Sequence, residues 1–265
     1  MYDLPAYVWA LVLTGVIGIP ATTSVMLYRS AIAGGFGRRP ATIVTVVAAA
    51  GLGGWILASG LLARAGVYHQ EPGHFRPWIG LAFAGYLIAL LAASRIPTVA
   101  HILAAPGSLA RLTLPHTLRV VGVLFLLVMA LGHLPAVFAL PAGLGDIAVG
   151  LAAPSIARRL TTDGDHTGAV RFHLLGLLDL VVAITIGYLA GLGPYRPLDI
   201  SPSTEPLSLL PLALVATVAV PTALALHAVA LARLHAADRT TSHKAEQLQP
   251  GAHSQRQTPM TRTQR

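Results

Sequence analysis

The 265-residue chain contains no cysteine, and only 11% of its residues are charged. Without cysteine, disulfide bonds, thiolate chemistry, Cys-type zinc sites and covalent haem attachment through cysteine are all excluded. Soluble globular domains carry about 25% charged residues, so this chain has less than half of the charge that a soluble surface normally carries. The low charge, together with 54% hydrophobic residues and a mean hydropathy of +0.68, indicates a protein that lies in a lipid bilayer.

Catalytic motifs are also missing. The sequence contains neither Gly-x-Ser-x-Gly nor His-Glu-x-x-His, so it carries no signature of a serine hydrolase or a zinc protease, and we do not expect an enzyme. The net charge is +8, but the basic residues lie in short segments between apolar stretches and in the C-terminal tail. Because they form no basic face interleaved with aromatic residues, we expect no nucleic-acid partner.

Long apolar runs are what the chain has in abundance. The predicted fold class is all-α, a polytopic membrane helix bundle of about seven transmembrane helices. Residues 1–232 form the predicted transmembrane domain, and the polar residues 233–265 form a disordered, basic cytoplasmic tail. The seven stretches that predict spanning helices are 6–28, 41–63, 78–94, 119–135, 137–157, 172–190 and 207–232.

The segment between the third and fourth stretches is apolar but interrupted by Pro106 and Pro115. Proline breaks helices in their interior, so we do not expect this segment to cross the membrane. We expect residues 98–118 to lie as an amphipathic segment on the cytoplasmic face, with a re-entrant loop as the alternative.

The basic residues are distributed unequally between the two sides of the predicted bundle. Fifteen fall on the side of the C-terminal tail, and three, Arg64, Arg76 and Arg196, fall on the other side. Cytoplasmic segments collect Arg and Lys, so the N-terminus is predicted to lie outside and the C-terminus inside. The abundance of Ala, Gly, Leu and Arg is typical of G+C-rich bacteria, and the predicted location is the bacterial cytoplasmic (inner) membrane.

Asp146 is the only charged residue in the stretch LPAGLGDIAVGLAAP, residues 140–154. On a helix, the residues on its face are all small: Ala139, Gly143, Gly150, Ala153 and Ala157. Small residues allow helices to approach closely, so this face is predicted to meet protein rather than lipid. Asp179 has the same setting in the sixth stretch, between Gly176 and Ala183.

A charged Asp at the bilayer centre costs about 2.5–3.5 kcal/mol on insertion scales, so each carboxylate needs a proton or a partner. No Arg or Lys is predicted at the depth of Asp146 and Asp179. The candidate partners are His227, deep in the seventh stretch, and two accessory candidates near span ends, His133 and His173. Two neighbouring carboxylates without a cation can share one proton and titrate as a unit. We therefore predict an ion- or proton-binding site at Asp146, Asp179 and His227.

Other interpretations of the same residues stay open. A protonated Asp can simply fasten one helix to another in a membrane scaffold or accessory protein. A membrane redox protein with haem between two axial histidines is a further alternative, for which His173 and His227 are the only couple at similar depth. A predicted outer loop holds His69, Glu71 and His74, but it lacks a rigid helical frame, and we expect no metal site there.

Two motifs in the last three stretches carry a resemblance to known proteins. Pro141-Ala142-Gly143-x-Gly145-Asp146 and Gly176-x-x-Asp179 lie in the segment 135–232. This segment resembles a group of small bacterial multi-pass membrane proteins of uncharacterised function. The resemblance implies a helical inner-membrane protein and supplies no activity, substrate or cofactor.

A proton- or cation-coupled transporter or permease is the function predicted from these features. Paired acids in a groove of small residues, beside spans that contain Pro141 and Pro221, suit the binding and release of a coupling ion, with His227 relaying protons toward the cytoplasm. The predicted membrane domain is short for a transporter, so a homo-oligomer is a further expectation. The expected partners are the lipid bilayer and a small ion or proton, and we expect no cofactor.

Overall fold

The computed structural model describes residues 4–70, 76–193 and 197–247, and within these ranges the chain forms helices and no strand. The predicted all-α membrane bundle is confirmed. Among the described residues, six helical segments are long and apolar enough to cross a membrane, or seven if one bent pair of helices counts as a span. The direction in which the chain crosses the membrane stays a prediction.

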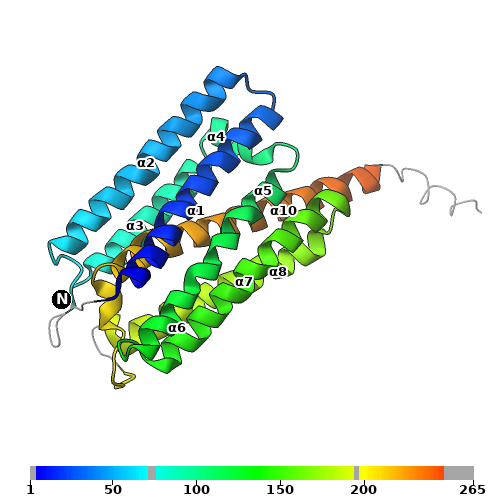
Figure 1. Ribbon diagram of the computed structural model, residues 1–265. Helices are drawn as coiled ribbons and strands as arrows, with labels where there is room; N and C mark the ends of the chain where they lie inside the picture. The colour runs from blue at the N-terminus through cyan, green and yellow to red at the C-terminus, as the bar shows by residue number, and fades with distance from the viewer. Residues whose placement is uncertain (1–3, 71–75, 194–196, 248–265) are drawn as a thin grey trace, which may run out of the picture.

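The first four helices form one side of the molecule (Figure 1). Helices α1 (Ala6–Ala33) and α2 (Arg38–Arg64) are an antiparallel pair. Helices α3 (Trp78–Ala93) and α4 (Pro97–Ala104) are the bent pair, with an angle of 75° between them. Pro97 begins α4, where its missing N–H costs no helical hydrogen bond, so the chain turns there instead of continuing α3.

Residues 108–130 form a single spanning segment in three parts. Helix α5 (Ser108–Thr113) leads into the 3₁₀ helix η1 (Leu114–Gly122), which leads into α6 (Val123–Ala130). Pro115 lies in the first turn of η1, a position that proline tolerates. The expectation that residues 98–118 lie on the membrane surface or re-enter is therefore wrong for 108–118, which belong to a span.

The next two spans are α7 (Ala136–Thr162) and α8 (His166–Gly187), which pack against each other. Asp165 caps α8, because its carboxylate accepts a hydrogen bond of 2.8 Å from the N–H of Gly168. Helix α8 continues into the π-helical turn η2 (Tyr188–Leu192).

The last span lies at the centre of the bundle. A short 3₁₀ helix, η3 (Glu205–Ser208), precedes α9 (Leu212–Leu214), the π-helical turn η4 (Val215–Ala219) and α10 (Val220–Gln247). In its most apolar stretch 78% of the residues are buried, against 11% for α2. Helix α10 crosses the middle of the molecule and packs against α3 and α8 (Figure 1).

Helix α10 also extends beyond the predicted end of the membrane domain at residue 232 and reaches Gln247. The rest of the predicted tail, 248–265, lies outside the described residues. The division into a membrane domain and a disordered tail stays a prediction.

The small-residue face of α7 packs against protein, which confirms the orientation predicted from its spacing. The members of this face that flank Asp146 are all buried: Ala139, Gly143, Gly150, Ala153 and Ala157. Leu144 and Leu151, on the flanks of α7, are 55% and 66% exposed and face outward. A Cβ at Gly150 would collide with the backbone of Val120, so α7 and η1 touch backbone to backbone at this glycine.

Candidate functional site

Arg119 lies between Asp146 and Asp179 in the interior of the bundle. Its Nε donates to Asp146 Oδ1 at 2.6 Å, and its Nη2 donates to Asp179 Oδ2 at 2.5 Å. The Arg119 side chain is 3% exposed, and those of Asp146 and Asp179 are 18% and 14% exposed. The three residues come from η1, α7 and α8, so the two ion pairs tie three segments together.

The position of Arg119 differs from the prediction. The prediction that no Arg lies at the depth of the two carboxylates is wrong, because Arg119 sits in the middle of the span Ser108–Ala130 and not at its cytoplasmic end. The sequence does contain a signal for this position. Residues 108–130 reach a hydropathy of 1.8, which is high enough for a span once Pro115 is allowed in the first turn of a helix.

Two glycines make room for the carboxylates between the helices. A Cβ at Gly122 would overlap the side chain of Asp146, and a Cβ at Gly145 would overlap that of Asp179. In the motif that ends in Gly145-Asp146, Asp146 supplies a carboxylate. Gly145 has no side chain and so leaves room for the carboxylate of Asp179 on α8.

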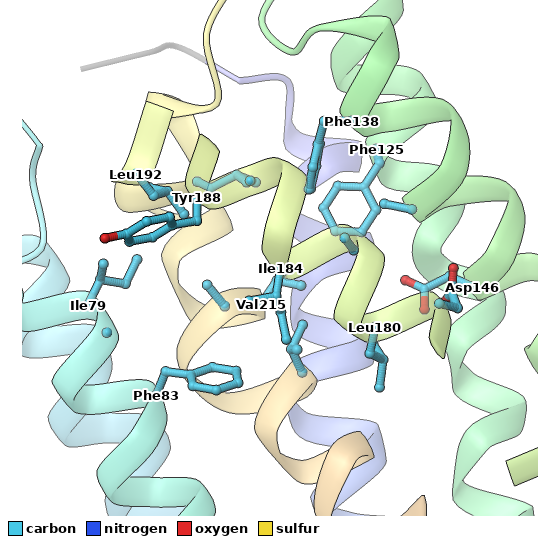
Figure 2. A pocket seen from close by; sticks show the side chains of 18 of the residues that line it. Ile79, Phe83, Phe125, Phe138, Asp146, Leu180, Ile184, Tyr188, Leu192 and Val215 are labelled. Atoms are coloured by element: carbon cyan, nitrogen blue, oxygen red, sulfur yellow. The ribbon is translucent and has the colours of Figure 1, made fainter. Parts of the chain in front are cut away.

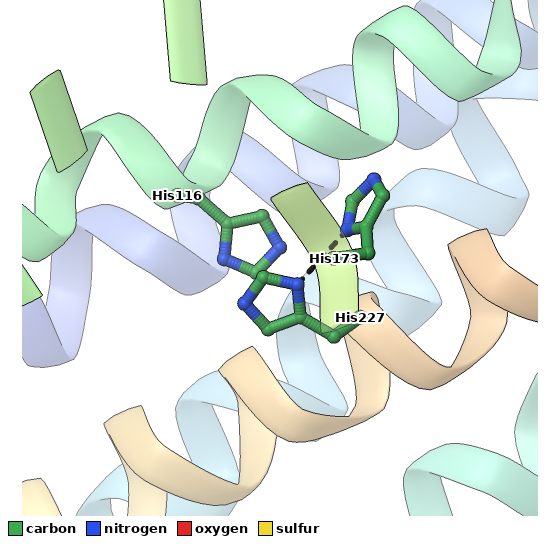
Figure 3. Close-up of side chains that lie close together, drawn as sticks. All are labelled: His116, His173 and His227. Carbon is green, nitrogen blue, oxygen red and sulfur yellow. Dashed lines mark hydrogen bonds between the residues drawn. The ribbon is translucent and has the colours of Figure 1, made fainter. Parts of the chain in front are cut away.

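Three histidines lie beyond Arg119: His116 on η1, His173 on α8 and His227 on α10 (Figure 3). Arg119 Nη1 is 3.1 Å from His227 Nε2, and His227 Nδ1 is 2.9 Å from His173 Nδ1. A guanidinium can only donate, so His227 Nε2 accepts, and in a neutral ring Nδ1–H donates to His173. His173 Nε2–H then points to Thr113 Oγ1 at 3.4 Å, and that hydroxyl donates to a backbone carbonyl. The hydrogen bonds thus run in one direction, away from Arg119.

His116 stands outside this chain of hydrogen bonds. Its ring stacks on His227, with centroids 3.8 Å apart and an angle of 20° between the planes. The side chain is 1% exposed, and neither ring nitrogen has a hydrogen-bond partner among the described residues. A buried polar group without a partner costs about 1–3 kcal/mol, so His116 weakens the folded state unless it has a further role.

The structure brings four of the five predicted site residues together around Arg119: Asp146, Asp179, His173 and His227. His133 lies elsewhere, in the turn between α6 and α7. It follows Arg119 by fourteen residues, which along a helical segment is on the order of 20 Å, so it is not a partner of the carboxylates. Arg119 and His116 were not predicted from the sequence.

An apolar cavity of about 300 Å³ reaches the two carboxylates. Four aromatic rings line it, those of Phe83, Phe125, Phe138 and Tyr188, together with aliphatic side chains from α3, α8 and the last span (Figure 2). Phe125 and Phe138 form an edge-to-face pair with centroids 5.3 Å apart. The cavity is therefore largely apolar, with two carboxylates at one end.

The charges along the cavity are unevenly placed. Among the described residues that line it, the charged ones are Asp146, Asp179 and Arg76. Arg76 precedes α3, and in Figure 2 the start of α3, marked by Ile79, lies on the opposite side of the cavity from Asp146. Arg119 is not among the described lining residues, but it forms ion pairs with both carboxylates. When all three members of this cluster are ionised, it carries one excess negative charge.

The histidine cluster has the spacing that a metal site requires, but its hydrogen bonds oppose one. Nitrogen atoms of His116, His173 and His227 lie within 4.8 Å of one another. A zinc ion with Zn–N bonds of about 2.0–2.1 Å would replace the His173–His227 hydrogen bond. Bound through Nδ1, His227 would carry its proton on Nε2 and turn a donor toward the donor Arg119 Nη1. The cluster therefore fits three neutral imidazoles better than a set of metal ligands. The other cluster, His69, Glu71 and His74, is not tested, because Glu71 and His74 lie outside the described residues.

The site does not fit a haem between His173 and His227. Two axial histidines bind the iron from opposite faces of the macrocycle. Here the two rings are joined by a direct hydrogen bond of 2.9 Å, which leaves no space for a porphyrin between them.

A comparison with protein families places the site in a known group. A family model described as a domain of unknown function, DUF8737, matches residues 76–235, more than half of the chain. The chain belongs to this family. The DUF8737 region runs from the start of α3 into α10 and includes Arg119, both aspartates and all three histidines of the cluster, whereas α1 and α2 precede it. The predicted membership of an uncharacterised family is confirmed, and no curated protein and no solved structure matches the chain.

Proposed function

We propose that this chain is a membrane transporter or permease coupled to protons or another small cation, with Asp146 and Asp179 as the ion-binding residues. The observation that carries the proposal is the charge of the buried cluster: Arg119 faces two carboxylates and neutralises one. An unbalanced charge in the interior of a membrane protein is costly. A proton or small cation at the carboxylates removes that cost, so the cluster is suited to bind one positive charge and release it.

Binding of a proton would also change how the helices are held. Arg119 binds Asp146 through Nε and Asp179 through Nη2, so a proton on either carboxylate weakens one ion pair and preserves the other. The two carboxylates belong to α7 and α8, and protonation therefore shifts the balance of attraction between η1 and these two helices. A coupled transporter needs such a link between ion occupancy and helix arrangement.

The cavity and His227 lie on opposite sides of the cluster formed by Arg119, Asp146 and Asp179. A volume of about 300 Å³ is at the lower end of the range for small-molecule sites, and both carboxylates line it, so the cavity is the proposed solute chamber. His227 lies on the other side of Arg119, within 3.1 Å of Nη1. A proton on Nε2 would face the donor Nη1, so we assign His227 to positioning Arg119 and not to relaying the proton.

The test uses purified protein in liposomes on a solid-supported membrane, exposed to rapid pH jumps. Proton binding to a buried site displaces charge, so we expect a transient current with the unmodified protein even without a solute. Asp146→Asn and Asp179→Asn should each reduce this current at least tenfold. Asp163→Asn, an exposed acid at the C-terminal end of α7, is the matched control and should retain it.

Two outcomes would contradict the proposal. In the first, the unmodified protein gives no current above that of empty liposomes. In the second, folded Asp146→Asn and Asp179→Asn variants respond like the unmodified protein. Either result would favour a membrane scaffold or accessory protein in which the ion pairs only hold helices together.

A further inference from the structure

The cavity beside the carboxylates restricts the chemistry of the solute that it can hold. We propose that it binds an amphiphilic organic monocation, an amine or quaternary ammonium compound with an apolar body, whose positive group lies at Asp146 and Asp179 in place of the coupling proton. This inference rests on the proposed function, since it names the solute that exchanges with the proton.

The lining argues for an apolar body. Apart from the three charged residues, Tyr188 is the only described lining residue whose side chain carries a polar atom. A sugar, peptide or nucleotide would lose hydrogen bonds to water in this chamber without gaining replacements. The rings of Phe83, Phe125 and Phe138, with the aliphatic side chains around them, instead suit an aromatic or alkyl group.

The charge of the cluster argues for one positive group. Asp146 and Asp179 share Arg119, so a monocation at the carboxylates brings the net charge of the cluster to zero. Phe125 and Phe138 line the same cavity as Asp146 (Figure 2), and the faces of aromatic rings attract cations. A neutral solute leaves the excess charge unbalanced, and an anion adds to it.

The exposed lining residues of the cavity argue for a solute that partitions into lipid. Helices α3 and α8 stand on opposite sides of the cavity in Figure 2, and apolar lining residues on both are exposed. Leu81 of α3 is 55% exposed, and Ile184 and Tyr188 at the end of α8 and the start of η2 are 37% and 47% exposed. In a bilayer these side chains face acyl chains, so an amphiphile can enter sideways from the membrane.

The test is equilibrium binding, measured by calorimetry with the full chain in lipid nanodiscs. The probe is benzyltrimethylammonium, which carries a permanent positive charge and one aromatic ring. Neopentylbenzene is its neutral match, because a carbon replaces the nitrogen and the shape is kept. We expect the cation to bind at least tenfold more tightly than the neutral match, and octyltrimethylammonium to bind as well.

Three variants and one control identify the site. Asp146→Asn and Asp179→Asn should each weaken cation binding at least tenfold, and Asp163→Asn should leave it unchanged. Ala183→Trp fills the cavity from α8 and should abolish binding of both cations.

The inference is overturned if neither cation binds, if the neutral match binds as tightly, or if the two Asn variants bind like the unmodified protein. Its failure is distinguishable from failure of the proposed function. An aspartate-dependent pH-jump current without cation binding would preserve ion coupling and reject this solute class. Aspartate-dependent cation binding without any current would preserve the binding site and reject coupled transport.

Discussion

Arg119 donates hydrogen bonds to groups on three helices. Nε and Nη2 bind Asp146 on α7 and Asp179 on α8, and Nη1 reaches the carbonyl of Gly176 on α8 and the ring of His227 on α10. Removing one partner from a buried ion pair is far more costly than replacing the whole pair by uncharged groups, because the remaining charge has no partner. At the scale of single residues, the members of this cluster therefore depend on one another.

We expect Arg119→Leu to lower the free energy of unfolding by about 3–5 kcal/mol, because it leaves two buried carboxylates without a cation. Adding Asp146→Asn and Asp179→Asn to the same chain removes the unpaired charges and should recover most of this loss. Denaturant unfolding of the purified protein in detergent measures both changes. A triple variant as unstable as Arg119→Leu alone would show that the charges are not the cause.

The two stacked histidines should respond in opposite ways to the same substitution. His116→Leu removes a buried ring without hydrogen bonds, and we expect unchanged stability or a gain of about 1 kcal/mol. His227→Leu removes the partner of His173 Nδ1 and one of the two acceptors of Arg119 Nη1, and it should cost about 1–3 kcal/mol. Thermal unfolding of the two variants side by side makes the comparison. A large loss for His116→Leu would mean that this ring has a partner or ligand in the membrane.

The candidate site could be predicted only in part from the sequence. Small residues around Asp146 on α7 were sufficient to predict that its face packs against protein. Arg119 was not recognised as a partner, because its depth in the membrane depends on how the chain passes Pro115, and composition alone does not fix that. The stacking of His116 on His227 joins residues more than one hundred positions apart, and no local pattern encodes it.

Glycine allows neighbouring helical segments of this bundle to pack closely. Helix α7 and η1 touch at Gly150, where an added Cβ would meet the backbone nitrogen of Val120. Backbone atoms cannot turn aside as a flexible side chain does, so a larger residue must push the two elements apart. The same elements carry Asp146 and Arg119, and the ion pair between these two therefore depends on this close contact.

Substitution of two glycines by alanine tests this contact. Alanine favours a helix over glycine by about 1 kcal/mol, so Gly51→Ala in α2, where no atom lies within 4 Å of the added Cβ, should be neutral or stabilising. Gly150→Ala should instead lower the free energy of unfolding by about 2 kcal/mol, because overpacking outweighs helix propensity. Chemical denaturation measures the pair. Equal effects at the two positions would rule out close packing as the reason for Gly150.

At the scale of the whole molecule, burial falls from the last span outward to α2. The last span is 78% buried in its most apolar stretch and α2 is 11% buried, although both are strongly apolar. Apolar side chains such as Val47 and Leu57 on α2 are 67% and 65% exposed. Exposed apolar side chains over whole helices are compatible with a lipid environment and not with water. The spans could be predicted well because this property depends on composition, whereas their boundaries depend on local breaks such as Pro115.

The absence of cysteine makes the predicted orientation simple to test, because each introduced cysteine is unique. Arg39 and Ala65 are exposed residues at opposite ends of α2. With the N-terminus outside, a membrane-impermeant maleimide should label Ala65→Cys in intact cells and Arg39→Cys only after permeabilisation. The reverse pattern would invert the topology and would make the histidine side of Arg119 the external one.

The central position of Arg119 has a consequence for how the protein is made. The span Ser108–Ala130 leaves the ribosome before α7 and α8, so its arginine reaches the translocon while both aspartates are still unsynthesised or inside the exit tunnel. Placing an unpaired Arg at the centre of a bilayer costs about 2.5–3.5 kcal/mol on insertion scales. This span should therefore wait beside the insertion machinery until α8 emerges, and the two ion pairs then form as the three segments enter the lipid together.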